Sequence, residues 1–309
     1  MVNTDYIAQF LADYAYPADA QEELVQVYAR ILQDEALCAQ MEAAQSALFD
    51  AERSREDYLI ALDGVAQTVN TAPQTIPLLC MIAASHKLRM LYEQNGLSLD
   101  IWRETMLDLR TKAMECKKLE GVYGLFGTGT PLWMVNYFRL QRFALGRLQY
   151  EIGALKAETC TVGGLTLSKG DSVLCCHIPS NGKPFDEQAR LASYKAAYAF
   201  YRGAMPVHYN GLVPITCDSW LLFPDHADML GERSNITAFM REFHLLRVDR
   251  MKTHTNLWRI FHTTDTENIA VLPETSGLQR AYKHRLQTGG DVGFGYGIFL
   301  FDGNKITNQ

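Results

Sequence analysis

The sequence lacks the cysteine and histidine spacings of a disulfide framework or a metal site. It contains seven cysteines, an odd number, and no Cys-x-x-Cys pair occurs among them. The eight histidines likewise show no His-x-x-x-His spacing. We therefore expect reduced thiols and no bound metal.

Long apolar runs are also missing. The longest, Leu78 to Ala84, is far shorter than the roughly 20 residues that a membrane-spanning helix needs. The first residues, Met1 to Tyr6, have neither the basic start nor the apolar run of a secretory signal. These features predict a cytoplasmic protein that does not bind a membrane.

The chain has no strong excess of charge of one sign. Its 29 Lys+Arg against 35 Asp+Glu give a net charge of −6, which does not favour nucleic acid as a main partner. Hydrophobic residues make up 48% of the chain and charged residues 21%, which is typical of folded domains with ordinary cores. A length of 309 residues suggests about two domains.

The first half of the chain has the pattern of helices throughout. After Pro17, apolar residues repeat with i, i+3, i+4 spacing at Leu24, Val27, Tyr28 and Ile31. Further helices are predicted over about 34–52, 56–70, 74–94, from Ser98 onward, and over 132–144.

A glycine-rich segment at 121–129 has the composition of a phosphate loop. It follows the charged end of a predicted helix, whereas a dinucleotide loop follows a buried strand. A turn between two helices is therefore the preferred interpretation.

The hydrophobic period changes from 3.6 to 2 at Gly146. Residues 146–153 alternate as a half-buried strand does, and 172–178 form a nearly continuous apolar strand. A helix rich in small residues follows over 186–201. We also predict a hairpin of 243–251 with 257–262, a helix over 276–286 and a last strand over 293–302.

The stretch 215–235 carries two polar residues, Asp218 and Ser219, on a strand predicted to run to Phe223 before Pro224. A buried carboxylate must be paired, hydrogen-bonded or facing a cleft, because burying it bare is costly. An aspartate at a strand edge that faces water fits equally well. Our hypothesis is that Asp218 is ionised and hydrogen-bonded within a cleft.

The loop Ser180-Asn181-Gly182-Lys183 joins a predicted strand to a predicted helix. Backbone N–H groups and the helix dipole can hold a phosphate at such a place. Taken alone, these residues fit an ordinary strand-to-helix connection better.

Five stretches together resemble the bacterial two-domain acyltransferase domain-containing proteins. They are FALGRLQYE (143–151), CHIPSNGKPF (176–185), CDSWLLFP (217–224), SNITAF (234–239) and ETSGLQRA (274–281). The resemblance implies an α+β fold, with an all-helical N-terminal domain at 1–145 and a GNAT-like mixed β-sheet domain with flanking helices at 146–309.

The same resemblance implies a reaction. A GNAT-like domain transfers an acyl group from acetyl-CoA or another acyl-CoA to an amine, here a small amine acceptor. It places the CoA pyrophosphate at the loop after its fourth strand, which matches Ser180, Asn181, Gly182 and Lys183. That loop usually reads Q/R-x-x-G-x-G/A, and this chain has the single glycine Gly182. The alternative is a GNAT-like ligand-binding or scaffold protein without catalysis.

The resemblance also implies a catalytic base and an acid. Candidate bases are Glu151, His177 and Asp218, of which His177 needs the least adjustment of its pKa. A histidine satisfied within the core is the competing interpretation.

Candidate acids are Tyr194, Tyr198 and Tyr282. A Cys217-His177-Asp218 hydrolase constellation is a further alternative, although no nucleophile-elbow motif supports it.

Overall fold

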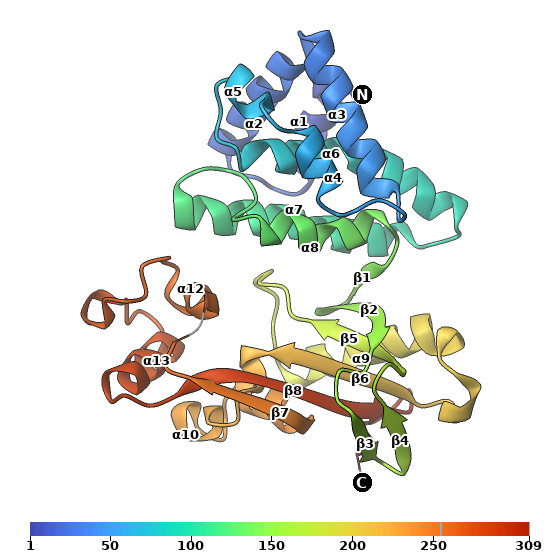
Figure 1. The fold of residues 1–309 in the computed structure, drawn as a ribbon, viewed down its shortest axis with the longest axis vertical. Helices are drawn as coiled ribbons and strands as arrows, with labels where there is room; N and C mark the ends of the chain where they lie inside the picture. The colour runs from blue at the N-terminus through green and yellow to red at the C-terminus, as the bar shows by residue number, and fades with distance from the viewer. Residues whose placement is uncertain (254, 309) are drawn as a thin grey trace. The chain divides into compact units, whose positions relative to one another are not determined.

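The computed structural model describes residues 1–253 and 255–308. By its contacts the chain divides into two compact units, Met1–Ala144 and Leu145–Gln309. The first unit is built of helices, and the second contains the sheets (Figure 1). The predicted α+β fold class is confirmed.

The helices of the first unit differ in how they begin, and three have a capping side chain. They are α1 (Thr4–Asp13), α2 (Ala18–Leu32), α3 (Glu35–Phe49), α4 (Asp57–Ala61), α5 (Val65–Thr68), α6 (Thr75–Gln94), α7 (Leu99–Glu120) and α8 (Gly129–Phe138). The side chains of Asn3, Asp34 and Ser98 accept N–H groups in the first turns of α1, α3 and α7. Helix α6 is buried along most of its length and forms the centre of this core.

Two helix predictions in this unit need correction. The predicted helix 56–70 is interrupted between α4 and α5, where Gly64 has φ +78°. The predicted helix 132–144 ends at Phe138, because Leu140 adopts φ +51° and the chain then enters strand β1 (Arg142–Leu145).

The second unit contains a six-stranded mixed sheet and a small hairpin. Its strands are β2 (Leu148–Ala154), β3 (Thr159–Val162), β4 (Leu165–Ser168), β5 (Ser172–His177), β6 (Val213–Ser219), β7 (His244–Met251) and β8 (Val292–Phe301). The large sheet has the order β1-β2-β5-β6-β8-β7, and β3 pairs only with β4. Strands β5 and β6 are parallel, whereas β6–β8, β7–β8 and β2–β5 are antiparallel.

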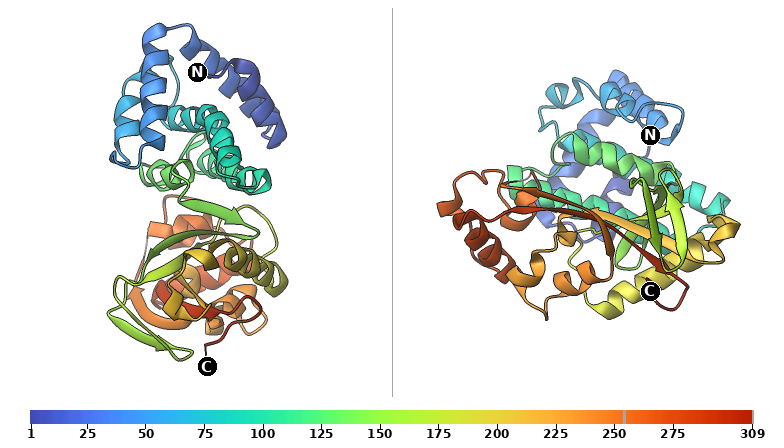
Figure 2. Two further views of the ribbon diagram at one scale, coloured as in Figure 1. Left: turned by 90° about the vertical axis from the view of Figure 1, so that its right-hand side faces the viewer. Right: turned by 60° about the horizontal axis from the view of Figure 1, so that its bottom comes forward.

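Helix α9 (Glu187–Tyr201) connects the two parallel strands and packs on one face of the large sheet (Figure 2). The Tyr194 ring lies 4.9 Å from that of Phe299, and the Tyr201 hydroxyl donates to the Tyr150 carbonyl at 2.9 Å. Asp186 caps the helix as its position predicts. This face of the sheet is therefore the core face.

Smaller elements complete the unit. They are the α-helices α10 (His226–Leu230), α11 (Asn235–Arg241), α12 (Trp258–Phe261) and α13 (Gly277–Gln287), and the 3₁₀ turns η1 (Arg202–Ala204), η2 (Val207–Tyr209), η3 (Trp220–Leu222), η4 (Thr255–Leu257) and η5 (Ile269–Val271). Ser276 and Gln279 form a capping box at the start of α13.

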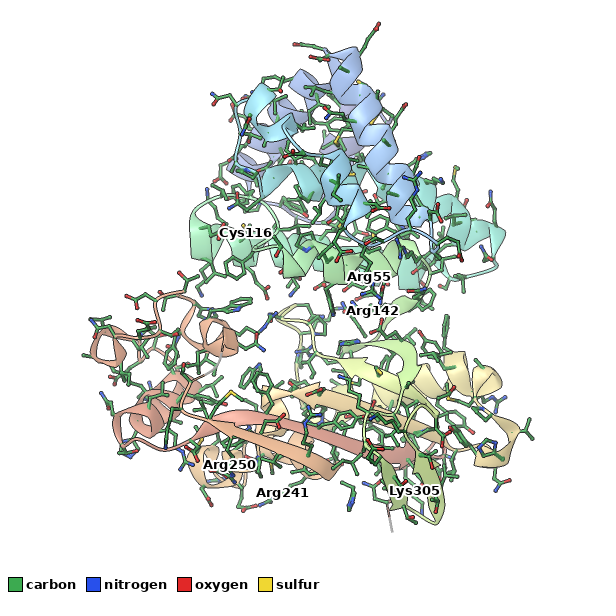
Figure 3. The ribbon with its side chains drawn as sticks, viewed as in Figure 1. Arg55, Cys116, Arg142, Arg241, Arg250 and Lys305 are labelled. Carbon is green, nitrogen blue, oxygen red and sulfur yellow. The ribbon has the colours of Figure 1, made fainter. Side chains whose placement is uncertain are left out.

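Asp225, just before α10, accepts hydrogen bonds from Arg250 of β7 at 2.7 Å and from Arg285 of α13 (Arg250 is labelled in Figure 3). These ion pairs join three separate elements.

Two strand predictions in this unit are wrong. The strand predicted to run to Phe223 ends at Ser219, whose hydroxyl accepts the N–H of Leu221 and starts the turn η3. Within 257–262, residues Trp258–Phe261 form helix α12 instead of a strand, since Ile260 and Phe261 pack into a cluster with Tyr282 of α13. The partner of β7 is β8.

No helix within the described residues is long and apolar enough to cross a membrane. All seven cysteines are free thiols. Over the same residues, no group of three His, Cys, Asp or Glu side chains lies in a metal-binding arrangement.

Candidate active site

A row of polar residues crosses the sheet on the face opposite α9. We call Gln149, His177, Asp218, Tyr296 and Arg247, one from each of five strands, the polar row. The register pairs Gln149 with His177, and Tyr296 with both Asp218 and Arg247. Because side chains alternate along a strand, these residues share one face. The fold thus brings predicted site residues from distant parts of the chain to one surface.

The polar row crosses the sheet where its two parallel strands stop pairing. Strands β5 and β6 pair at Leu174–Ile215 and Cys175–Thr216. Beyond that point β5 continues to His177 and β6 continues to Ser219. The registered pairing therefore ends before the carboxyl ends of both strands.

His177 and Glu151 form an acid–base contact on this surface. His177 Nε2 lies 2.9 Å from Glu151 Oε1, and the two side chains are 27% and 17% exposed. In a neutral ring that donates Nε2–H to the carboxylate, Nδ1 carries the lone pair. The carboxylate thereby fixes both the orientation and the tautomer of the imidazole.

Asp218 is held by two cations. Lys156 Nζ lies 2.9 Å and Arg247 Nη2 lies 3.4 Å from Asp218 Oδ2, and the aspartate side chain is 30% exposed. Partial burial opposes the charged form of Lys156, but the hydrogen bond and charge of Asp218 outweigh it and raise the lysine pKa. The expected hydrogen bonding of Asp218 is thus present. That it lies in a cleft stays a prediction.

Tyr296 and Cys175 lie on the same face of the sheet as these two pairs. The Tyr296 hydroxyl accepts the Lys156 N–H at 3.1 Å, and burial raises the pKa of this phenol. The Thr216 hydroxyl donates to Cys175 Sγ at 3.8 Å, and burial raises the pKa of that thiol as well. A Cβ at Gly153 would lie 2.6 Å from Cys175 Sγ, which is too close, so the position next to this sulfur requires glycine. A thiol with a raised pKa is a poor nucleophile.

Other predicted candidates lie on the core face. Cys217 neighbours Asp218 on β6, points to the opposite face and is 2% exposed, so the Cys217-His177-Asp218 constellation does not form. Tyr194 donates to Glu242 at 2.6 Å inside the core, and Tyr198 packs on Phe301.

Tyr282, the third acid candidate, is also buried away from the polar row. Its hydroxyl lies 2.7 Å from His226 Nε2 beneath α10.

The loop after β5 contains a glycine whose backbone is open to a ligand, as a phosphate site requires. Gly182 has φ +72°, and a Cβ built there would meet nothing within 4 Å. The Lys183 N–H, however, donates to Asn181 Oδ1 at 3.2 Å and closes an Asx turn. Arg147 anchors the start of the loop through the Pro179 carbonyl at 2.9 Å.

The helix that follows this loop begins with acidic groups. Asp186 accepts the Ala189 N–H at 2.8 Å, and Glu187 lies in the first turn. Two carboxylates at the N-terminus of α9 compete with an anionic ligand there. A pyrophosphate would therefore have to use the loop rather than the helix end. The assignment of Ser180, Asn181, Gly182 and Lys183 to CoA stays a prediction.

Lys156, Tyr296 and Arg247 were not candidates from the sequence. Lys156 lies in a connection, 140 residues from Tyr296 in the chain. The pairing of β6, β8 and β7 brings Tyr296 and Arg247 beside Asp218, and Lys156 reaches it from the connection after β2. No local pattern in the sequence signals this arrangement.

Both units match known family models. Residues 5–140 match the N-acyltransferase N-terminal domain, and residues 142–299 match the GNAT-like C-terminal domain. No curated protein matches the chain in sequence.

Solved acyltransferase structures share the fold. One mutant acyltransferase in complex with octanoyl-CoA has a TM-score of 0.75 at 20% identity and covers 96% of this chain and 88% of its own. Another, in complex with decanoyl-CoA and teicoplanin, has a TM-score of 0.72 at 21% identity and covers 94% and 86%. A third, in complex with decanoyl-CoA, has a TM-score of 0.61 at 19% identity and covers 96% and 99%.

The fold is that of a two-domain acyltransferase. The chain belongs to the family that joins an N-acyltransferase N-terminal domain to a GNAT-like C-terminal domain. The resemblance found in the sequence is confirmed.

Proposed function

We propose that this protein is an acyl-CoA-dependent N-acyltransferase whose acceptor is an amine. The observation that carries the proposal is the contact between His177, in the polar row, and Glu151, beside the point where β5 and β6 stop pairing. Membership of the acyltransferase family supports it.

The reaction requires a base at the acceptor nitrogen. That nitrogen attacks the thioester carbonyl, a C–N bond forms, and the C–S bond of the thioester breaks. The nitrogen loses one proton, and the thiolate of CoA gains one. A histidine with a near-neutral reference pKa is suited to take the first proton.

We assign roles to the residues of the site on this basis. His177 takes the proton from the acceptor, and Glu151 orients its ring. Tyr296 carries the hydroxyl that the polar row offers as a proton donor to the leaving thiolate. Asp218 holds Lys156 and Arg247 in place at the same surface.

The raised pKa of the Cys175 thiol favours direct transfer. A covalent acyl-cysteine would require a thiolate, and burial disfavours that form here. The acyl group therefore passes from CoA to the amine in one displacement.

The acyl-CoA would lie where the registered pairing of β5 and β6 ends, with its pyrophosphate at 180–183. Gly182 supports this placement, because its open surroundings let another molecule approach the backbone. Similar folds hold octanoyl-CoA and decanoyl-CoA, which makes medium-length acyl chains the first donors to test.

The decisive experiment separates binding from transfer. Calorimetric titration of the full chain with CoA, acetyl-CoA, octanoyl-CoA and decanoyl-CoA measures donor binding. Release of free CoA thiol, followed with a panel of small amines and with a glycopeptide amine, measures transfer.

The proposal predicts saturable donor binding and amine-dependent release of CoA. Binding without release for any amine would favour a ligand-binding protein. No heat with any acyl-CoA would favour a scaffold protein and would overturn the proposal.

A further inference from the structure

Strand β7 forms one edge of the large sheet. It lies at the end of the strand order, next to β8, and within the described residues no strand pairs with its outer side (Figure 1). Every residue of β7 is at least partly exposed, whereas β8 is buried at all but one position. The outer N–H and C=O groups of an edge strand can pair with a strand of another chain. This edge is therefore a candidate interface.

Two opposite charges and one apolar residue lie along the middle of this edge. Arg247 and Asp249 share the face of the polar row, and Val248 between them points to the other face. The side chains of Arg247 and Asp249 are 46% and 43% exposed, and Arg247 Nε lies 2.9 Å from Asp249 Oδ2. Val248 is 37% exposed, so part of its apolar surface faces water. The edge thus offers both charge and apolar surface to a partner strand.

The regular part of the edge is short. The pairing of β7 with β8 shifts register between Leu245 and Arg247, and such a bulge bends the strand. From Arg247 to Met251 the pairing is regular. A partner strand would therefore pair with a small number of residues, which predicts a weak association.

Symmetry limits how two β7 strands can pair. Two identical antiparallel strands that join their sheets are related by a two-fold axis, which is the commonest symmetry of soluble oligomers. Side chains alternate between the two faces, and the faces of the joined sheets must match. The axis must therefore pass through a position at which one residue lies opposite the same residue of the second copy.

Charge distinguishes the registers that this symmetry allows. A register centred at Arg247 or at Arg250 places two arginines opposite each other, and one centred at Asp249 places two aspartates opposite each other. The register centred at Val248 pairs Arg247 of each copy with Asp249 of the other. It also brings the two Val248 side chains together on the opposite face. Unlike charges directly opposite each other stabilise a sheet and like charges destabilise it, so this edge is complementary to itself in the register centred at Val248.

We propose that two copies of this chain associate by antiparallel pairing of their β7 strands, centred at Val248. The two six-stranded sheets then form one continuous sheet, with the polar-row faces of both copies on the same side. A second copy is the occupant because the charges of the edge complement their own two-fold image. The association does not depend on acyl transfer.

Sedimentation equilibrium of the full chain over a wide range of concentrations measures the association. We expect a reversible monomer–dimer equilibrium with a Kd of about 10–100 μM, since one short edge gives a small interface. High salt should weaken the dimer, because exposed charge pairs are screened. Backbone amides of β7 should exchange hydrogen more slowly at high protein concentration than at low, because pairing protects their N–H groups.

Two charge variants and their mixture test the register. Asp249→Lys places two cations opposite each other at both ends of the pairing, and Arg247→Glu places two carboxylates there. Each variant alone should associate about 30-fold more weakly than the wild type, since two attractions become two repulsions. An equimolar mixture should associate like the wild type. In that mixed dimer Arg247 of one copy meets Asp249 of the other, and the introduced lysine meets the introduced glutamate.

The matched control breaks an exposed ion pair away from this edge. Glu158 Oε1 lies 2.7 Å from Lys169 Nζ, and both side chains are exposed. Glu158→Lys reverses one charge of that pair and should leave the association unchanged. Val248→Lys, which places two cations beside the two-fold axis, should weaken it and serves as the second variant if Arg247→Glu does not fold.

Three results would overturn the proposal. One is a wild type that stays monomeric at every concentration, which would favour a strand of a different protein as the occupant of the edge. Another is a dimer that neither Asp249→Lys nor Val248→Lys weakens, which would place the interface elsewhere. The third is a mixture of the two folded charge variants that associates no better than each variant alone.

Discussion

His177 and Glu151 are diagonal neighbours on two antiparallel strands, joined by a contact of 2.9 Å between Nε2 and Oε1. In the register His177 lies opposite Gln149, and Glu151 lies opposite Cys175. Long side chains reach across such diagonals in a sheet. The contact turns the imidazole along the sheet face, where a substrate at the polar row would lie.

Replacement of the base should lower the rate of transfer and leave donor binding intact. We expect His177→Gln to reduce kcat by about 100- to 1,000-fold, the usual contribution of a positioned base. Glu151→Gln should cost about tenfold, because its amide oxygen can still accept the ring N–H. Steady-state kinetics with calorimetric acyl-CoA affinities measure both effects.

The control for these variants is His244→Gln, an exposed histidine on β7. Its kcat should equal that of the wild type. If His177→Gln retained wild-type kcat while His244→Gln lost it, the assignment of the base would be wrong.

Neutralising Asp218 should change stability little. Its two ion pairs are partly exposed, so Asp218→Asn should lower the free energy of unfolding by less than about 1 kcal/mol. The difference from the wild type should shrink in high salt, because screening weakens these pairs. Urea denaturation at two salt concentrations measures this, and a large loss independent of salt would contradict the assignment.

Gly182 should matter for donor binding beyond its effect on stability. Its φ of +72° strains any other residue, and Gly164, in the β3–β4 turn with φ +78°, is equally open. Gly182→Val and Gly164→Val should each cost about 1–3 kcal/mol of stability. Only Gly182→Val should lower acyl-CoA affinity by more than about tenfold.

Calorimetry on both glycine variants, with thermal unfolding as the reference, separates strain from binding. Lys183→Ala should weaken donor binding by a smaller factor and flatten its salt dependence. Equal acyl-CoA affinity of the two valine variants would place the CoA elsewhere.

Local patterns predicted much of the fold. Alternation identified β2, small residues identified α9, and the helix predicted over 276–286 corresponds to α13. Residues 257–262 were assigned wrongly as a strand, because so short an apolar run fits either structure until its packing on α13 is known. The division into domains at 1–145 and 146–309 stays a prediction.

The candidate site was harder to predict from the sequence than the fold. His177, Glu151 and Asp218 could be named because each lies on a predicted strand. Their neighbours Lys156 and Tyr296 could not, since Tyr296 is placed by the antiparallel pairing of β6 with β8 and Lys156 by a connection far from both in the sequence.

Tyr194 and Tyr198 of α9 were candidate acids, but both pack in the core. A spacing of i, i+4 shows that residues share a helix face, and it does not show which partner that face meets. In this chain the partner is the apolar face of the sheet, through Phe299 and Phe301.

Acid should remove the stabilising effect of Asp225. The hydrogen bond from Arg250, together with the charges of Arg250 and Arg285, lowers the pKa of this carboxyl below its usual value despite partial burial. A depressed pKa in the folded state means that the contribution is present above about pH 4 and is lost as pH falls through the folded value. Asp225→Asn should therefore lower the free energy of unfolding by about 2 kcal/mol at neutral pH, the usual scale for a hydrogen bond to a charged group.

Urea denaturation between pH 3 and 7 measures this effect. The difference in unfolding free energy between wild type and variant should become smaller toward the acid end. Asp228→Asn, at an exposed position of α10, is the matched control and should match the wild type throughout. A gap that stays constant with pH would mean that the Asp225 side chain stabilises the fold by packing rather than by its charge.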